Sequence, residues 1–209
     1  MKEKVKAMIT VPPSSANSEN NPYAGIDKLL LTLEKTGKKY DIEKIKRAYL
    51  FAKEMHEGQY RYSGEAFISH PVAVAEIVAS LELDTDSLCA ALLHDTVEDC
   101  GVEIATIKSK FGQDVAALVD GLTKLVQIPF DDKEDEHIEN LRKMFLAMSK
   151  DVRVILIKLC DRLHNMRTLG VKKDEKRRLT ALETMHVYAP LAHRLGMQRM
   201  KQELENLAL

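Results

Sequence analysis

The sequence lacks the features that mark several common classes of protein. Tryptophan is absent, aromatic residues make up only 5%, and no window approaches the roughly 20 apolar residues of a membrane span. The 31 basic and 32 acidic side chains nearly cancel, to a net charge of −1, which argues against a nucleic-acid coat or a polybasic membrane binder. With 45% apolar residues in 209, the composition is that of a soluble globular protein with one sizeable domain.

Cysteine is also scarce. Cys89, Cys100 and Cys160 are an odd number without a CxxC pair. Two of them lie in apolar helical runs, where a reduced, buried thiol is expected. Residues 1–10 carry scattered lysines without a continuous apolar segment, unlike a secretory signal. These features favour a reducing compartment, and we expect a cytoplasmic protein.

Strand patterns are missing as well. No segment shows sustained alternation of apolar and polar residues between hairpin turns. Residues 152–157 are β-like, but their apolar pattern continues to Met166, which favours a buried helix. Residues 1–25, rich in Pro, Ser and Asn, predict a flexible leader. The remainder predicts an all-α fold, a bundle of roughly ten helices.

Helix boundaries are indicated by capping and breaking residues. Asp41 has the character of an N-cap, and Pro71 suits the first residue of a helix. The expected helices cover residues 26–36, 42–57, 71–81, 85–97, 103–111, 114–125, 136–149, 152–168, 174–188, a short piece from 190, and 198–207, with loops at 59–69 and 127–135.

The richest concentration of chemistry follows the apolar run 88–93. His94, Asp95, Glu98 and Asp99 can ligate a metal or move a proton. A merely polar helix end explains them poorly, because acidic residues at a helix C-terminus oppose the macrodipole. His94 and Asp95 point about 100° apart on a helix, so both reach one metal if other segments complete its shell.

His70 and Asp161 are the candidates for the remaining ligands. His70 ends the unpatterned loop. Asp161, Asn165 and Thr168 recur at i, i+4 and i+7 on an otherwise apolar helix, and such a polar stripe is costly unless it faces a pocket. The alternatives are a surface or capping histidine, and an aspartate paired with a neighbouring basic residue.

Two imidazoles and two carboxylates form a nitrogen–oxygen ligand shell without thiolate. This shell suits Mn²⁺ or Fe²⁺ better than structural Zn²⁺. Such a metal activates water and polarises a phosphoryl oxygen, while Glu98 and Asp99 would orient the water and take its proton. No P-loop, Gly-rich phosphate cradle or Ser/His/Asp triad accompanies these residues. They predict a divalent-metal phosphohydrolase.

Basic side chains near these ligands would position the phosphates. Arg61 and Tyr62 could also stack on a base. The mixed charge run 172–178 is expected to be a solvated helix face. The candidate positioning residues are Arg61, Lys158, Arg162 and Arg167, with Ser63 and Asn165 as hydrogen-bonding groups.

Six segments carry a resemblance to a known family. They are residues 56–59, Arg61 with 63–65, 68–71, 93–95 with 98–99, 120–121 with 123–125, and 156–169. They resemble the HD hydrolase domain of the RelA/SpoT-homologue (Rel) proteins, which hydrolyse the alarmones ppGpp and pppGpp. The likeness extends from about Ala48 to the last residue.

The resemblance implies an all-α HD fold with one Mn²⁺. The implied reaction removes the 3′-pyrophosphate of the alarmone, giving GDP or GTP plus pyrophosphate. The matching positions are His70, His94, Asp95 and Asp161 for the metal, Glu98 and Asp99 for catalysis, and Arg61 (against the guanine), Ser63, Asn165 and Thr168 for the nucleotide pocket.

This sequence departs from the family in two respects. Tyr62 stands where members often carry a basic residue, which alters the anion or base contact expected there. Long members continue into a synthetase domain. We expect a hydrolase domain over 26–195, and residues 196–209 look like the start of the connection to that domain. The chain then resembles a fragment of a bifunctional enzyme.

Two other functions stay open. One is a different HD phosphohydrolase, acting on dNTPs, cyclic dinucleotides or nucleoside monophosphates. Arg61, Asn165 and Thr168 argue against it. The other is a non-catalytic nucleotide-sensing module, against which the complete ligand set argues.

Overall fold

The computed structural model describes residues 21–126, 150–171 and 174–209. Over these ranges the protein is all-α, as expected, and holds no strand beyond an isolated bridge between Tyr60 and Ala66. The expected loop at 127–135 and helix at 136–149 lie outside the described residues. No helix in the described ranges is long and apolar enough to cross a membrane.

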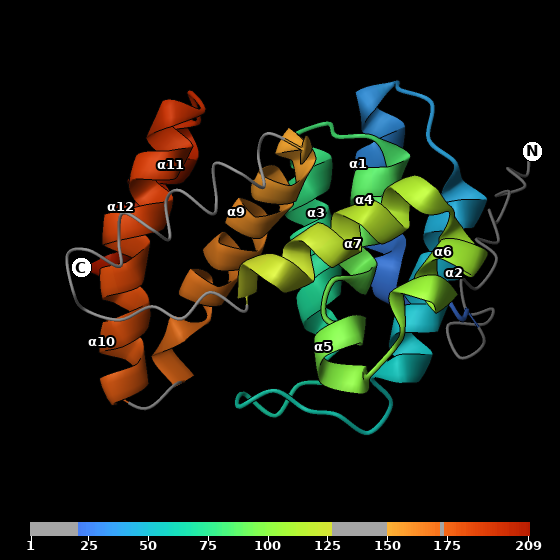
Figure 1. Ribbon diagram of the computed structural model, residues 1–209, viewed down its shortest axis with the longest axis horizontal. Coiled ribbons are helices and arrows are strands. Elements are labelled where there is room, and N and C mark those ends of the chain that lie inside the picture. Colours follow the sequence, from blue (N-terminus) through green and yellow to red (C-terminus); the bar gives the residue numbers. More distant parts are fainter. Residues whose placement is uncertain (1–20, 127–149, 172–173) are drawn as a thin grey trace, which may run out of the picture.

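Figure 1 shows the helices of the described residues, whose limits largely follow the apolar spacing of the sequence. A 3₁₀ turn at Ala24–Ile26, another at Leu169–Val171 and a π-helix at Thr184–Tyr188 interrupt the α-helical series. The α-helices are α1 Asp27–Thr36, α2 Ile42–Met55, α3 Ser69–Ser80, α4 Thr85–Leu93, α5 Thr96–Cys100, α6 Ile104–Phe111, α7 Gln113–Val126, α9 Val152–Arg167, α10 Asp174–Glu183, α11 Ala189–Arg194 and α12 Gln198–Ala208.

Several boundaries arise from the expected local chemistry. The Asp41 side chain accepts a hydrogen bond from the backbone N–H of Lys44, so the predicted N-cap of α2 is confirmed. Gly37 ends α1 at a φ of +68°, a conformation that glycine adopts without strain. The predicted start of α3 at Pro71 was two residues late, because α3 begins at Ser69.

Two expected helices are interrupted. The predicted helix 85–97 breaks at His94 and Asp95 into α4 and α5. The predicted helix 174–188 changes at Thr184 from α10 into the π-helix, where the Thr184 hydroxyl donates to the carbonyl oxygen of Thr180 at 2.7 Å. Side-chain hydrogen bonds to preceding carbonyls occur at both interruptions, a local effect that apolar periodicity does not report.

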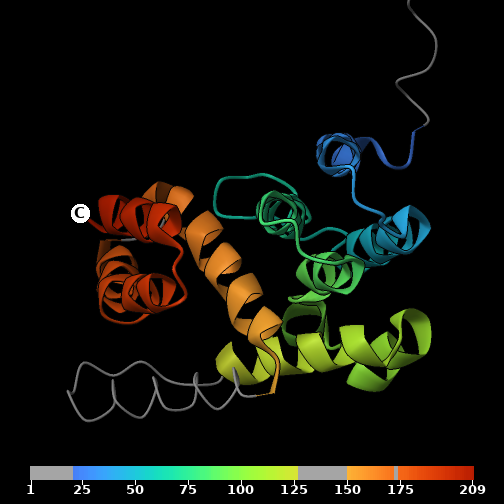
Figure 2. The same ribbon diagram turned by 90° about the horizontal axis from the view of Figure 1, so that it is seen from above.

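The core is built around α4, whose residues from Ser87 to Leu93 are all buried. Helix α4 packs against α2, α3, α7 and α9. Figure 2 shows α9 crossing between this core and the group formed by α10, α11 and α12. Helix α9 contacts α3 and α7 on one side and α12 and the π-helix on the other. The residues of α9 therefore stay fixed relative to both groups.

Cys89 and Cys160 are buried, unpaired thiols, as expected. Burial raises the pKa of both to about 12, so neither is a thiolate at neutral pH. Cys100 is also unpaired and half-buried.

Candidate active site

His94 and Asp95 form the turn that joins α4 to α5. The turn is fixed by the Thr96 hydroxyl, which donates to the carbonyl oxygen of Leu93 at 2.7 Å. The backbone N–H of Asp99 donates to the carbonyl oxygen of Asp95 at 2.8 Å. The break leaves His94 buried beneath a pocket and Asp95 on the pocket wall.

The two ring nitrogens of His94 have different surroundings. Nδ1 lies 2.7 Å from the carbonyl oxygen of Ala91, so Nδ1 carries the proton and donates it. In the neutral imidazole, the form that binds a metal, the lone pair of Nε2 is then directed into the site. Within the described part of the chain Nε2 is buried without a hydrogen-bond partner, although Asp95 Oδ1 lies 3.0 Å away. This arrangement suits two ligands of one cation.

His70 and Asp161 reach the same point from two other helices. His70 lies in the first turn of α3 and Asp161 in α9, with only 4% and 5% of each residue exposed. His70 Nε2 lies 3.2 Å from Asp161 Oδ1 and 3.5 Å from Asp95 Oδ2. His94 Nε2 lies 3.8 Å from Asp161 Oδ1. Four side chains from three segments that are far apart in the sequence thus converge.

The other carboxylate oxygen of Asp161 has a cationic partner, because Lys158 Nζ donates to Oδ2 at 2.7 Å. Burial would raise the pKa of Asp161, but Lys158, His70 and His94 hold it well below its usual value. Burial would lower the pKa of His94, but the carboxylates of Asp95 and Asp161 raise it to about 9. Pairing with a basic neighbour therefore occupies one oxygen of Asp161, and the other faces the histidines.

This donor set could hold a metal ion. The ligand atoms of His70, His94 and Asp161 lie within 4.8 Å of one another, and all three residues are buried. Asp95 adds a second carboxylate within 3.5 Å of both imidazole Nε2 atoms. Imidazole nitrogens and carboxylate oxygens, without thiolate, suit a divalent transition metal.

Glu98 and Asp99 stand on α5 beside the ligand cluster and line the pocket. Partial burial, with the nearby carboxylates of Asp95 and Asp99, raises the pKa of Glu98 to about 7. Partial burial and Asp95 also raise the pKa of Asp99. A carboxylate with a pKa near neutrality can accept and release a proton at physiological pH.

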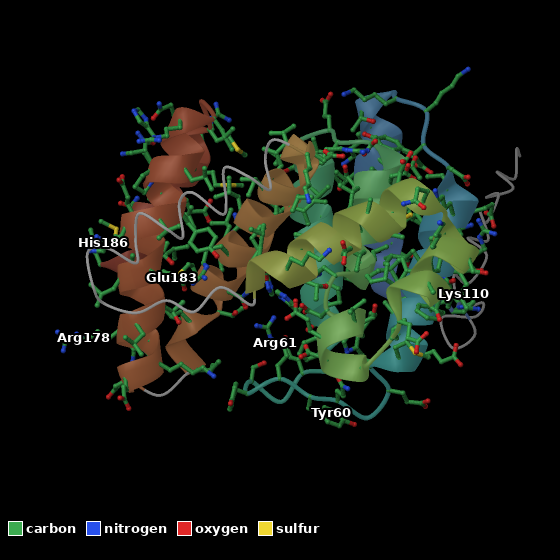
Figure 3. All side chains as sticks on the ribbon, viewed as in Figure 1. Tyr60, Arg61, Lys110, Arg178, Glu183 and His186 are labelled. Atoms are coloured by element: carbon green, nitrogen blue, oxygen red, sulfur yellow. The ribbon has the colours of Figure 1, made fainter. Side chains whose placement is uncertain are left out.

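The loop before α3 is more ordered than its lack of periodicity indicated. The backbone N–H of Arg61 donates to the carbonyl oxygen of Glu65, and that of Gly64 to the carbonyl oxygen of Arg61, both at 2.9 Å. Gly64 has a φ of +86°, which a residue with a Cβ would adopt only with strain. This turn aims Arg61 towards α9, whereas Tyr60 lies further out on the loop (Figure 3).

Arg61 is anchored on α9. Its Nη2 donates to the hydroxyl of Thr168 at 3.2 Å, and its Nη1 lies 3.3 Å from His164 Nδ1. The same His164 nitrogen is 2.7 Å from Nδ1 of His70. Burial lowers the pKa of Arg61, against the opposing effect of nearby carboxylates such as Asp95. His164 therefore lies between a basic pocket residue and a candidate metal ligand.

A pocket of about 600 Å³ opens above the cluster, a volume that accommodates a nucleotide. Aromatic, basic and acidic side chains share its wall. The lining residues are Tyr60, Arg61, Tyr62, Phe67, His70, Asp95, Glu98, Asp99, Lys158, Asp161, Asn165 and Lys176. The pocket therefore combines the expected metal ligands with the expected acidic pair and several of the expected substrate residues.

Three of the expected positioning residues lie elsewhere. The Arg162 guanidinium pairs with Glu183 at 2.7 Å and lies 4.1 Å from the Tyr188 ring centroid, so it joins α9 to the C-terminal helices. Arg167 pairs with Glu203 on α12. Ser63 is exposed and outside the pocket lining. In Figure 3, Glu183 lies on the side of α9 away from Arg61.

Two residues of the site were missed. His164 shares the face of α9 that carries Asp161, at i+3, so helical spacing contained the signal. Lys176 was assigned to a solvated helix face, yet this exposed side chain of α10 lines the pocket. Its position depends on how α10 packs, which spacing along one helix cannot report.

The fold and the site define an all-α protein with a histidine–aspartate cluster beneath a pocket. Residues 48–198 match the HD domain family. Because this match spans well over half of the 209 residues, the chain belongs to the HD domain family.

Among curated proteins, the chain is 54% identical over 166 residues to the guanosine-3′,5′-bis(diphosphate) 3′-pyrophosphohydrolase of Vibrio cholerae. It is 53% identical over 166 residues to the bifunctional (p)ppGpp synthase/hydrolase SpoT of Escherichia coli K12. Each alignment covers 79% of this chain and 24% of the relative. The chain therefore spans about a quarter of the length of these relatives.

A solved structure of a metazoan SpoT orthologue, described as hydrolysing ppGpp, superimposes with a TM-score of 0.60. The match covers 81% of this chain and 96% of that chain, at 24% identity. At this identity the likeness supports the fold alone.

Proposed function

We propose that this protein is a metal-dependent phosphohydrolase that removes the 3′-pyrophosphate of ppGpp and pppGpp, giving GDP or GTP plus pyrophosphate. The observation that carries the proposal is the convergence of His70, His94, Asp95 and Asp161 beneath a pocket lined by Glu98, Asp99 and Arg61. The names of relatives about 50% identical to this chain support the choice of substrate.

We propose Mn²⁺ as the ion, held by His70, His94, Asp95 and Asp161. When bound, the metal supplies a Lewis acid that activates water and polarises a phosphoryl oxygen. Lys158 keeps Asp161 ionised, and the hydrogen bond to Ala91 keeps His94 in the tautomer that offers Nε2.

The acidic pair handles the proton of the attacking water. Glu98, with a pKa near 7, accepts the proton as the water oxygen bonds to phosphorus. The bond from phosphorus to the 3′-oxygen breaks, and the 3′-oxygen becomes the hydroxyl by taking up the proton that Glu98 accepted, directly or through solvent, which restores the Glu98 carboxylate. Asp99, whose pKa is also raised, stands beside Glu98 and orients the water.

The other side of the pocket recognises the nucleotide. Arg61, fixed by Thr168, presents a flat guanidinium against which a guanine can stack. Tyr62 is 79% exposed and offers a second flat surface beside it. Lys176 also lines the pocket and supplies positive charge for the phosphates of the nucleotide.

The decisive test is hydrolysis of ppGpp by the purified protein with Mn²⁺, with GDP and pyrophosphate both quantified. We expect stoichiometric release of the two products. Asp95→Ala should abolish activity by loss of metal binding. Glu98→Gln should still bind Mn²⁺ but turn over about 10²–10⁴-fold more slowly, because it removes the proton acceptor.

Glu43→Gln on α2 is the matched control, since this exposed carboxylate lies outside the pocket. It should retain wild-type activity. Metallated protein that releases no pyrophosphate from ppGpp would contradict the proposal. Hydrolysis of a dNTP, a cyclic dinucleotide or a nucleoside monophosphate in its place would identify another HD phosphohydrolase.

A further inference from the structure

The two histidines of the cluster are held in place by different kinds of partner. The outer nitrogen of His94 donates to a backbone carbonyl oxygen, that of Ala91. The outer nitrogen of His70 meets a side chain, His164 Nδ1, at 2.7 Å. A backbone carbonyl is fixed by its helix, whereas a side chain can respond to its other contacts.

The positions of the hydrogens at His70 follow from geometry. His70 Nε2 faces Asp161 and Asp95 at 3.2 and 3.5 Å, so Nε2 is the nitrogen that offers its lone pair to the ion. Nδ1 then carries the proton and donates it to His164 Nδ1. His164 must accept there, which places its own proton on Nε2.

The same lone pair of His164 has a second neighbour. Arg61 Nη1 lies 3.3 Å from Nδ1, and an arginine nitrogen can only donate. The donor–acceptor distance is 2.7 Å from His70 and 3.3 Å from Arg61, so the two donors share one acceptor unequally.

We infer that His164 is a positioning residue that accepts hydrogen bonds from His70 and Arg61 at once, fixing the metal ligand and the nucleotide-binding guanidinium relative to each other. The inference rests on the proposed function. Helix α9 is a suitable carrier, because it also bears Asp161 as a ligand and Thr168 as the second anchor of Arg61.

Leucine and asparagine at position 164 provide a matched pair of variants. Both side chains branch at Cγ into two δ atoms, but only asparagine has an oxygen acceptor where His164 has Nδ1. Leucine is the better helix former, so a deficit of His164→Leu relative to His164→Asn cannot come from helix propensity. His193→Leu, at an exposed position on α11, controls for loss of a histidine away from the pocket.

The primary measurement is Mn²⁺ affinity without nucleotide, by titration calorimetry, after thermal melts have verified folding. We expect His164→Leu to weaken Mn²⁺ binding about 10–100-fold, the usual effect of losing such an outer partner. His164→Asn should bind within about threefold of wild type, and His193→Leu should match wild type. A folded His164→Leu variant that binds Mn²⁺ as tightly as wild type would overturn the inference.

The second measurement addresses Arg61. The affinity for GDP, measured in the presence of a chelator, reports nucleotide binding by the pocket without a contribution from the metal. We expect His164→Leu to weaken GDP binding in the wild-type background and to have a smaller effect in Arg61→Ala. Equal effects in both backgrounds would show that His164 does not act through Arg61.

These readouts separate the inference from the proposed function. A protein that binds Mn²⁺ but does not hydrolyse ppGpp would contradict the proposed activity. The comparison of Mn²⁺ affinity between His164→Leu and His164→Asn would still test the inference. An active enzyme whose His164→Leu variant keeps full Mn²⁺ affinity would contradict the inference about His164 and leave the proposed activity intact.

Discussion

At the scale of the single residue, Glu98 shows how its surroundings can adapt an ordinary carboxyl group to a proton-transfer role. Partial burial and the neighbouring carboxylates raise its pKa to about 7. A proton acceptor must be ionised to act, so its pKa determines the pH range in which the enzyme works. A bound cation would favour the ionised form and lower the pKa of Glu98 below that value.

The first prediction is therefore a rising limb in the pH profile of kcat/KM. Activity with Mn²⁺ should increase with pH as Glu98 loses its proton, with a midpoint at or below pH 7. Glu98→Gln cannot ionise, so its residual activity should lack this limb. The measurement is ppGpp hydrolysis between pH 5 and 9, and an identical rising limb in Glu98→Gln would assign it to another group, such as Asp99.

At the scale of the element, the close approach of α7 and α9 depends on Gly121, which has no side chain. A methyl group at Gly121 would come within 2.9 Å of Val154 Cγ2 and 3.3 Å of Cγ1. Both distances are shorter than ordinary van der Waals contact, so either the Val154 side chain or helix α9 would have to move away from α7. Because α9 carries Asp161, a movement of α9 would also disturb the ligand cluster.

We predict that Gly121→Ala destabilises the protein despite the better helix propensity of alanine. Overpacking costs about 1–3 kcal/mol, and the propensity gain returns up to about 1 kcal/mol. Urea unfolding should therefore show a lower free energy of unfolding, by about 1–2 kcal/mol. In a Val154→Ala background, which lacks both γ-methyl groups, the same substitution should be neutral or stabilising. A loss of the same size in that background would exclude the contact as the cause.

At the scale of the whole molecule, the site joins segments that are far apart in the sequence. His70 lies on α3, His94 and Asp95 on the turn between α4 and α5, and Asp161 on α9. An ion bound by all of them would favour the folded state, because the unfolded chain does not hold this donor set together.

The third prediction is a metal-dependent rise in Tm. At a free Mn²⁺ concentration about 100 times Kd, the folded state gains about 2.7 kcal/mol, which corresponds to a shift of roughly 5–10 °C for a chain of this size. A chelator should reverse the shift. The Asp95→Ala variant should show little rise in Tm with Mn²⁺. A rise equal to that of the wild type would mean that the ion binds elsewhere.

The sequence predicts best those features that depend on local chemistry. The N-cap at Asp41 and the glycine that ends α1 follow from the chemistry of a few adjacent residues. The break at His94 did not follow from apolar spacing, because it arises at a polar turn on the edge of the core.

The division into a hydrolase domain at 26–195 and a connecting segment after it stays a prediction.

The candidate site shows the same division. Residue type and position along the chain predict His70, His94, Asp95 and Asp161 as ligands, and the fold brings them together. The structure pairs the guanidinium of Arg162 with Glu183 on α10, outside the pocket lining, and its expected role in phosphate binding stays a prediction. No pattern within α9 indicates which of its basic residues meets a partner from another helix.

The sequence by itself determined the helical class, most helix limits and the types of residue available for metal and phosphate chemistry. These properties depend on spacing and side-chain chemistry within one segment. Only the tertiary structure decided that His164 lies between His70 and Arg61, and that Lys176 reaches the pocket while Arg162 does not. Those outcomes depend on how α9 and α10 pack against other parts of the protein, which residue spacing along a single helix does not specify.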